Sequence, residues 1–135
     1  MHIAAAPQIT LIIAAALGLL NVWLGARVVR VRVSRRVSLG YGELPGMEGR
    51  CRAHANFNEY VPMALILMGL VEMNVGASRW LWAIGAVLVV ARVLHPFGMD
   101  RPAPNPYRAG GAILTFVSLL ALIGWAIAIS YGVRL

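Results

Sequence analysis

Three polar residues recur at helical spacing at the start of an otherwise apolar stretch. Arg52, Asn56 and Glu59 stand at positions i, i+4 and i+7, so a helix would place all three on one face. The face would extend over roughly 10 Å, at about 1.5 Å per residue. A cation, an amide and a carboxylate together can hold a polar, partly anionic ligand with carboxylate, peptide and ammonium groups. The alternative is a cluster that only fixes helix packing, with Glu59 paired to an arginine of another helix.

A second pair of polar residues follows further along the chain. Arg92 and His95 are three positions apart, so a helix would again place them on one face. A charged side chain inside a bilayer costs roughly 2.5–3.5 kcal/mol on insertion scales, so Arg92 needs a partner, and Glu59 is the candidate. A histidine near a helix end more often packs or lies at an interface than takes part in catalysis.

Other charged residues stand where apolar runs begin or end. Arg108 opens the last run, and it is either an anchor at the membrane surface or a cation close to a reacting anion. Arg30 and Arg32, at the end of the first run, have the same two interpretations, with the anchor favoured. Glu72 stands near the far end of the second run, where we expect it to lie at the membrane interface.

Several other functional classes lack their signatures. The chain has no glycine-rich phosphate loop and no Cys/His spacing suited to zinc, and its single cysteine, Cys51, excludes an intrachain disulfide. The net charge is +7 and no lysine is present, but the arginines flank or interrupt apolar runs instead of forming a soluble basic face. We therefore expect anionic lipid headgroups or an anionic ligand as partners, and neither nucleic acid nor a metal ion.

The composition predicts a membrane protein. Hydrophobic residues make up 60% of the 135 positions and charged residues only 13%, against roughly a quarter in soluble domains. A bilayer core of about 30 Å needs about 20 helical residues, and helices satisfy their own backbone groups in lipid. The apolar runs predict a single all-α domain of four transmembrane helices, at 9–31, 50–73, 79–98 and 108–131.

The distribution of arginines predicts the orientation in the membrane. The connection after the first span contains Arg35 and Arg36, and the connection after the third contains Arg101, whereas the short turn at 74–79 holds one arginine. Loops rich in arginine stay in the cytoplasm. We therefore expect the first and third connections to be cytoplasmic and both termini to lie outside.

The polar residues of the second run carry a family resemblance. Residues 52–62, RAHANFNEYVP, match R-x-x-x-N-x-x-E-x-x-P at every fixed position, and this pattern resembles the second-helix signature of the membrane-associated proteins in eicosanoid and glutathione metabolism, the MAPEG superfamily. Residues 92–95, RVLH, resemble the R-x-x-H of the family's third helix. The resemblance covers nearly the whole chain and is strongest to the small bacterial branch.

The resemblance implies an assembly and a ligand. It implies a homotrimer of four-helix protomers in the bacterial inner membrane, with glutathione bound between neighbouring subunits at the cytoplasmic side. The positions that match its glutathione-binding residues are Arg52, Asn56, Glu59, Tyr60, Arg92 and His95, together with Arg30 or Arg32 from the adjacent subunit. Arg108, thirteen residues after His95, matches the arginine that activates the thiol.

The implied activity is that of a membrane-bound glutathione transferase acting in detoxification. A thiol with a pKa of about 8.5 is mostly protonated at neutral pH, and the thiolate is the nucleophile. A nearby arginine favours the charged thiolate and stays protonated itself. The thiolate would attack a lipophilic electrophile that enters from the membrane.

The sequence also departs from the family's enzymes. Met99 stands where several members have a tyrosine, and Ala109 stands where one group has a serine. The superfamily includes a non-catalytic lipid-binding member, so a lipid-binding or scaffold protein is the main alternative. A small proton-coupled exporter is a third hypothesis, but such exporters usually carry an unpaired carboxylate in the first span, and here Glu59 lies in the second.

Overall fold

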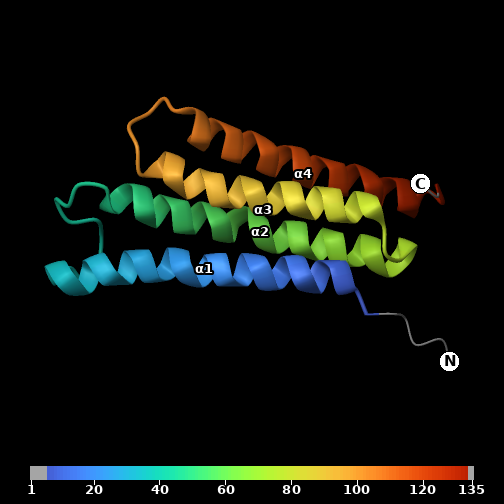
Figure 1. The fold of residues 1–135 in the computed structure, drawn as a ribbon, viewed down its shortest axis with the longest axis horizontal. Coiled ribbons are helices and arrows are strands. Elements are labelled where there is room, and N and C mark those ends of the chain that lie inside the picture. Colours follow the sequence, from blue (N-terminus) through green and yellow to red (C-terminus); the bar gives the residue numbers. More distant parts are fainter. Residues whose placement is uncertain (1–5, 134–135) are drawn as a thin grey trace.

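The chain folds into four long helices that run alternately up and down. In the computed structural model, which describes residues 6–133, the helices are α1 (Gln8–Arg35), α2 (Met47–Val75), α3 (Arg79–Met99) and α4 (Pro106–Ser130). Figure 1 shows the α1–α2 and α3–α4 connections at one end of the bundle. The α2–α3 turn and the two ends of the described chain lie at the other end.

Four helices cross the membrane in this arrangement. By length and composition, α1, α3 and α4 each suffice to span a bilayer. The 29 residues of α2 are also long enough, but its first half carries Glu48, Arg50, Arg52 and Glu59. Since α2 connects the end of α1 to the start of α3, and these two helices run in the same direction, α2 must cross back between them. The predicted four-helix membrane bundle is confirmed.

Local sequence signals define where the later helices begin. Ser78 caps α3, because its side-chain oxygen accepts a hydrogen bond from the backbone N–H of Trp80 at 3.2 Å. Asn105 caps α4 in the same way by accepting from the backbone N–H of Arg108 at 2.9 Å, and Pro106 occupies the first helical position. These caps place Arg108 in the first turn of α4.

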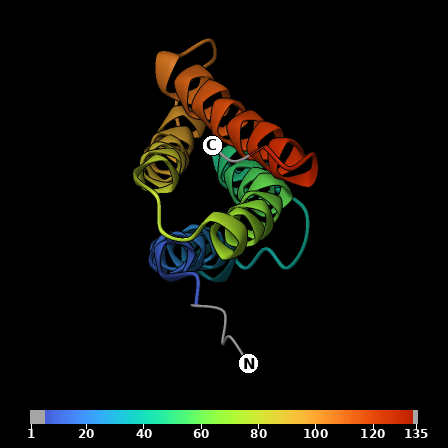
Figure 2. The same ribbon diagram turned by 90° about the vertical axis from the view of Figure 1, so that its right-hand side faces the viewer.

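The helices form a bundle in which α2 and α3 lie between α1 and α4. Viewed along the bundle, α1 and α4 are on opposite sides (Figure 2), and no close approach joins them. The most extensive packing is between α3 and α4. Gly111 permits it, because a Cβ atom at this position would lie 2.8 Å from the Cβ of His95 and 2.9 Å from the carbonyl oxygen of Ala91.

Apolar side chains fill the interior and also cover the outside. Leu17, Phe57, Met68, Leu88 and Leu122 are buried in one core cluster that all four helices share. Large apolar side chains on the outer faces of all four helices are at the same time exposed, as a lipid-facing surface requires. The outer surface of the bundle is therefore apolar, as expected of a protein that is embedded in a lipid bilayer.

A buried carboxylate caps the first helix. Glu72, near the end of α2, accepts hydrogen bonds from the backbone N–H groups of Ile9 and Thr10, each at 2.8 Å, and from the Thr10 hydroxyl at 2.7 Å. Its side chain is buried against the start of α1, so at the interfacial end of α2, where the sequence predicts it, Glu72 faces another helix and not water. The carboxylate satisfies the orphan donors of the α1 N-terminus and complements the positive end of the helix dipole.

Candidate functional site

A fully buried arginine forms the centre of the polar cluster. Arg92, on α3, is 0% exposed, and its Nη1 and Nη2 atoms each donate to Oδ1 of Asn56 on α2 at 3.0 Å. Nη1 also donates to Oγ1 of Thr115 on α4 at 3.3 Å, and the Phe57 ring lies 5.5 Å from the guanidinium carbon. Arg92 thus ties three helices together through neutral oxygen acceptors.

The acidic residue of the second helix pairs within its own helix. Arg52 Nη1 lies 3.8 Å from Glu59 Oε1, and both side chains are about half exposed, at 50% and 46%. Within the described chain Arg92 has no carboxylate in ion-pair contact, so the expectation of a Glu59–Arg92 pair is wrong. Glu59 and Tyr60 still lie within electrostatic range of Arg92.

The predicted face of the second helix is present and divides into an inner and an outer part. The side chain of Asn56 is turned towards Arg92, whereas those of Arg52 and Glu59 stay open to the surroundings of the bundle. Tyr60 is half-buried and makes an edge-on contact with Phe116 of α4, with ring centroids 5.2 Å apart. The first half of α2 therefore presents a charged pair outwards beside a fixed amide and ring.

The α3–α4 junction holds the remaining predicted residues. His95 is buried against Gly111, and its Nδ1 has no hydrogen-bond partner in the described part of the chain. Arg92 and Arg108 both lie within electrostatic range of His95, and Arg108 is exposed. Asn105 fixes the start of α4, since its Nδ2 donates to the carbonyl oxygen of Gly98 at 2.8 Å. The structure therefore brings His95 and Arg108 to the same junction as Arg92.

The two arginines of the first helix lie apart from this cluster. Arg30 is exposed, and no hydrogen bond or ion pair within residues 6–133 joins it to the predicted residues of α2, α3 or α4. Arg32 bonds instead to the carbonyl oxygen of Ser38 at 3.3 Å and to Sγ of Cys51 at 3.8 Å. Within one protomer, therefore, neither arginine completes the site.

The structure adds polar contacts that the sequence pattern did not single out. The Thr115 hydroxyl accepts a hydrogen bond from Arg92, as Asn56 does. The only sign of this contact in the sequence is a polar residue inside the apolar run of α4. A second network joins α1 to α2: His54 Nε2 lies 2.9 Å from Asn21 Oδ1, and Asn21 donates to Asn58 at 3.2 Å. Gly25 of α1 lies beside the imidazole.

The described chain offers no assembled metal site. Among residues 6–133, no group of three His, Cys, Asp or Glu side chains is placed to hold a metal ion. The chemistry available at the cluster is that of guanidinium, carboxylate, amide, imidazole and phenol groups. These groups suit a charged organic ligand with both acidic and basic parts.

The fold and the cluster define a class of four-helix integral membrane proteins with a polar site built on the second helix. The sequence profile of the MAPEG family matches residues 10–128, and the chain belongs to this family. It is 36% identical over 97 residues to the inner membrane protein YecN of Escherichia coli strain K12, covering 71% of this chain and 72% of that protein. The YecN protein of E. coli O6:H1 strain CFT073 matches with the same identity and coverage.

Proposed function

We propose that this MAPEG protein is a membrane-bound enzyme of the glutathione transferase type, with glutathione as co-substrate. The observation that carries the proposal is the half-exposed Arg52–Glu59 ion pair on the outward face of α2, beside the Asn56–Arg92 contact. Glu59 lies about 10 Å further along α2 than Arg52, so its open carboxylate would face lipid, which is costly. A zwitterionic ligand or a second subunit would cover it.

The pair can exchange its internal partners for those of a ligand. Glu59 would accept from the ammonium group of glutathione, and Arg52 would donate to one of its carboxylates. After binding, Arg52 and Glu59 would each contact an opposite charge of the ligand, in place of the single ion pair that they share in the free protein. Tyr60 would line one side of the ligand, whereas the fully buried Arg92 would act through Asn56, whose amide it holds, and His95 would stand beyond Arg92.

Arg108 is the residue that we propose to activate the thiol. A guanidinium near the sulfur favours the thiolate over the thiol, because opposite charges attract. The thiol proton would pass to water, and the thiolate would attack an electrophilic carbon of a lipophilic molecule held in the bilayer, forming a carbon–sulfur bond as the leaving group departs with its bonding electron pair. Orientation of both reactants would supply much of the rate enhancement.

The site would be completed between subunits of a homotrimer. The outward face of α2 continues from Arg52 and Glu59 through Met63, Ile66 and Leu70, each more than half exposed. Such a stripe supports a contact with a second copy of the chain, and Arg30 or Arg32 of a neighbour would then reach the ligand. The similarity to the inner membrane protein YecN supports an inner-membrane location, and we propose that the arginine-rich connections of the trimer lie in the cytoplasm.

The test is the ultraviolet difference spectrum of glutathione thiolate on the purified protein in detergent. We expect a thiolate signal near neutral pH that is lost in Arg108→Ala, while glutathione binding persists. Binding itself, measured by calorimetry, should be lost in Arg52→Gln and in Glu59→Gln. Glu43→Gln is the matched control, because this exposed acid has no ion pair within the described residues.

Two results would reject this function. Unchanged glutathione binding in both Arg52→Gln and Glu59→Gln would remove the ligand from the α2 face. Absence of both binding and thiolate in a correctly folded wild-type protein would leave the non-catalytic alternative, a lipid-binding or scaffold protein of the same fold. Asn56 is unsuitable for this test, because its side chain also holds Arg92.

A further inference from the structure

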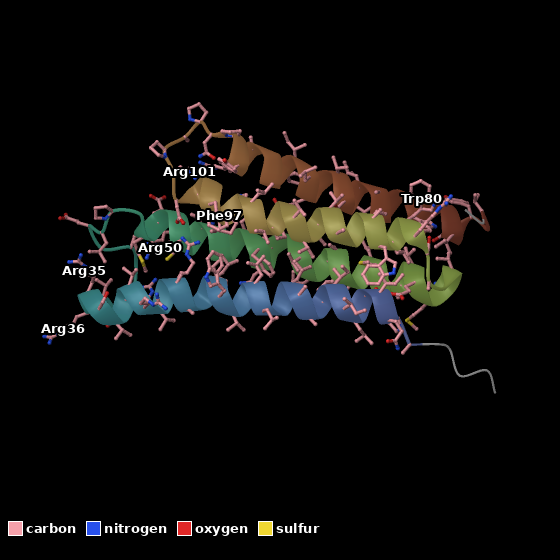
Figure 3. The ribbon with its side chains drawn as sticks, in the orientation of Figure 1. Arg35, Arg36, Arg50, Trp80, Phe97 and Arg101 are labelled. Carbon is pink, nitrogen blue, oxygen red and sulfur yellow. The ribbon has the colours of Figure 1, made fainter. Side chains whose placement is uncertain are left out.

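A second basic site lies at the same end of the bundle, on another side of the second helix. A pocket of about 270 Å³ separates the last turns of α1 from the start of α2. Its polar lining consists of Ser34, Arg35 and Arg50, and its apolar lining includes Val31, Leu44 and Met47. Figure 3 shows Arg35 and Arg50 at this end, together with Arg36 and Arg101.

The pocket is separate from the proposed thiol site. Arg50 and Arg52 are two residues apart on α2, and a helix turns by about 200° over two residues at 3.6 residues per turn. Their side chains therefore leave the helix on nearly opposite sides. No residue proposed above to bind glutathione lines this pocket.

The pocket contains two cations and no anion of the protein. Arg35 and Arg50 form no ion pair within residues 6–133, and neither Glu43 nor Glu48 belongs to the lining. The Ser34 hydroxyl donates to the carbonyl oxygen of Val31 at 3.1 Å, so its proton is already engaged. Two guanidinium groups facing one cavity provide donors in the geometry that suits a phosphate.

The depth of the pocket indicates which phosphate this is. At about 1.5 Å per residue, α1 is about 42 Å long, which matches a bilayer core of about 30 Å plus its headgroup layers. The final turns of α1, which line the pocket, therefore lie at headgroup level. Apolar and basic groups meet in the same cavity, as a phosphodiester attached to glycerol and acyl chains requires.

We propose that this pocket binds the headgroup of an anionic phospholipid. Arg35 and Arg50 hold the phosphate from α1 and α2, and the apolar part of the lining contacts the glycerol and the first methylene groups. A lipid held there connects two helices whose link, residues 36–46, is outside any helix.

The experiment is native mass spectrometry of the full chain in mild detergent with added phosphatidylglycerol or phosphatidylcholine of identical acyl chains. We expect preferential binding of phosphatidylglycerol, weakened about tenfold or more in the double variant Arg35→Gln/Arg50→Gln. Arg36→Gln/Arg101→Gln removes the same charge from the same end without touching the lining, and it should keep the wild-type preference. The melting temperature of each variant in phosphatidylcholine verifies folding.

Any one of the following results would overturn the proposal. Equal binding of the two lipids by the wild type would exclude a phosphate site of this specificity. An equal loss in both double variants would reduce the effect to general surface charge. Competition by free glycerol phosphate or inorganic phosphate as effective as the lipid would assign the pocket to a soluble anion.

If the double variant does not fold, the single variant Arg35→Gln, at an exposed position, must show the loss of phosphatidylglycerol binding. Unaltered lipid binding in Arg35→Gln would equally reject the site.

Discussion

The Asn56–Arg92 contact allows a quantitative test of how the buried charge is held. Replacing Asn56 by leucine, which has a similar shape, removes the oxygen that accepts from both Nη atoms at 3.0 Å. Arg92 remains fully buried, with Thr115 at 3.3 Å as its remaining acceptor. Leaving a buried donor without its acceptor costs about 1–3 kcal/mol and more when the donor is charged, so we expect Asn56→Leu to cost about 3 kcal/mol or more.

The double variant separates this cause from simple loss of packing. In Asn56→Leu/Arg92→Met the guanidinium without its acceptor is gone, and exchange of a buried charged group for an apolar one is often neutral or stabilising. We therefore expect the double variant to be more stable than Asn56→Leu by about 2 kcal/mol or more. Asn58→Leu, two residues further along α2, breaks a neutral contact with Asn21 and should cost only about 0.6–1.7 kcal/mol, as neutral contacts between membrane helices do.

The measurement is equilibrium unfolding in mixed micelles of mild and denaturing detergent, followed by circular dichroism. The three variants are compared with the wild type under one set of conditions. A cost for Asn56→Leu no larger than that for Asn58→Leu would refute the reasoning. A double variant no more stable than Asn56→Leu would show that the charge is not the source of the cost.

Two further predictions concern helix contacts. Gly111→Ala should destabilise the protein by about 1–3 kcal/mol, because its Cβ would meet α3 at 2.8 Å, whereas Gly110→Ala has open space and should be neutral or slightly stabilising in the same unfolding assay. Glu72→Gln should cost about 1–3 kcal/mol, since it loses the charge at the helix N-terminus and one acceptor. Hydrogen exchange at Thr10 should accelerate in that variant and not in Glu43→Gln, and equal exchange in both would contradict the capping role.

The fold could be predicted from the sequence because length and apolarity are strong signals in membrane helices. The predicted spans fall within the observed helices, apart from a one-residue excess at the end of the last, and Arg52, Asn56 and Glu59 share a face of α2 as their spacing indicates. The helical period determines which residues of one helix are neighbours. Within a single helix, therefore, spacing was sufficient.

Contacts between helices could not be predicted in the same way. Glu59 pairs with Arg52 instead of Arg92. Arg92 instead donates to Asn56 and Thr115. Which partner Arg92 reaches depends on how the helices are rotated and how far apart they lie, and the spacing along the chain specifies neither. The attraction between opposite charges predicts a carboxylate partner for Arg92, whereas its observed partner is the neutral amide of Asn56. Small residues such as Gly111 set the distance between α3 and α4, and this distance decides which side chains of the two helices can touch each other.

The cap on the first helix has a consequence for biosynthesis. The first backbone donors of α1 find their acceptor in Glu72, a residue 62 positions after Thr10. While the chain emerges from the ribosome, α1 therefore enters the translocon with an uncapped N-terminus, and it acquires its partner only when nearly all of α2 has been synthesised. The natural unit of insertion is consequently the α1–α2 hairpin, and a nascent chain arrested before Glu72 should leave the membrane more readily than one arrested just after it.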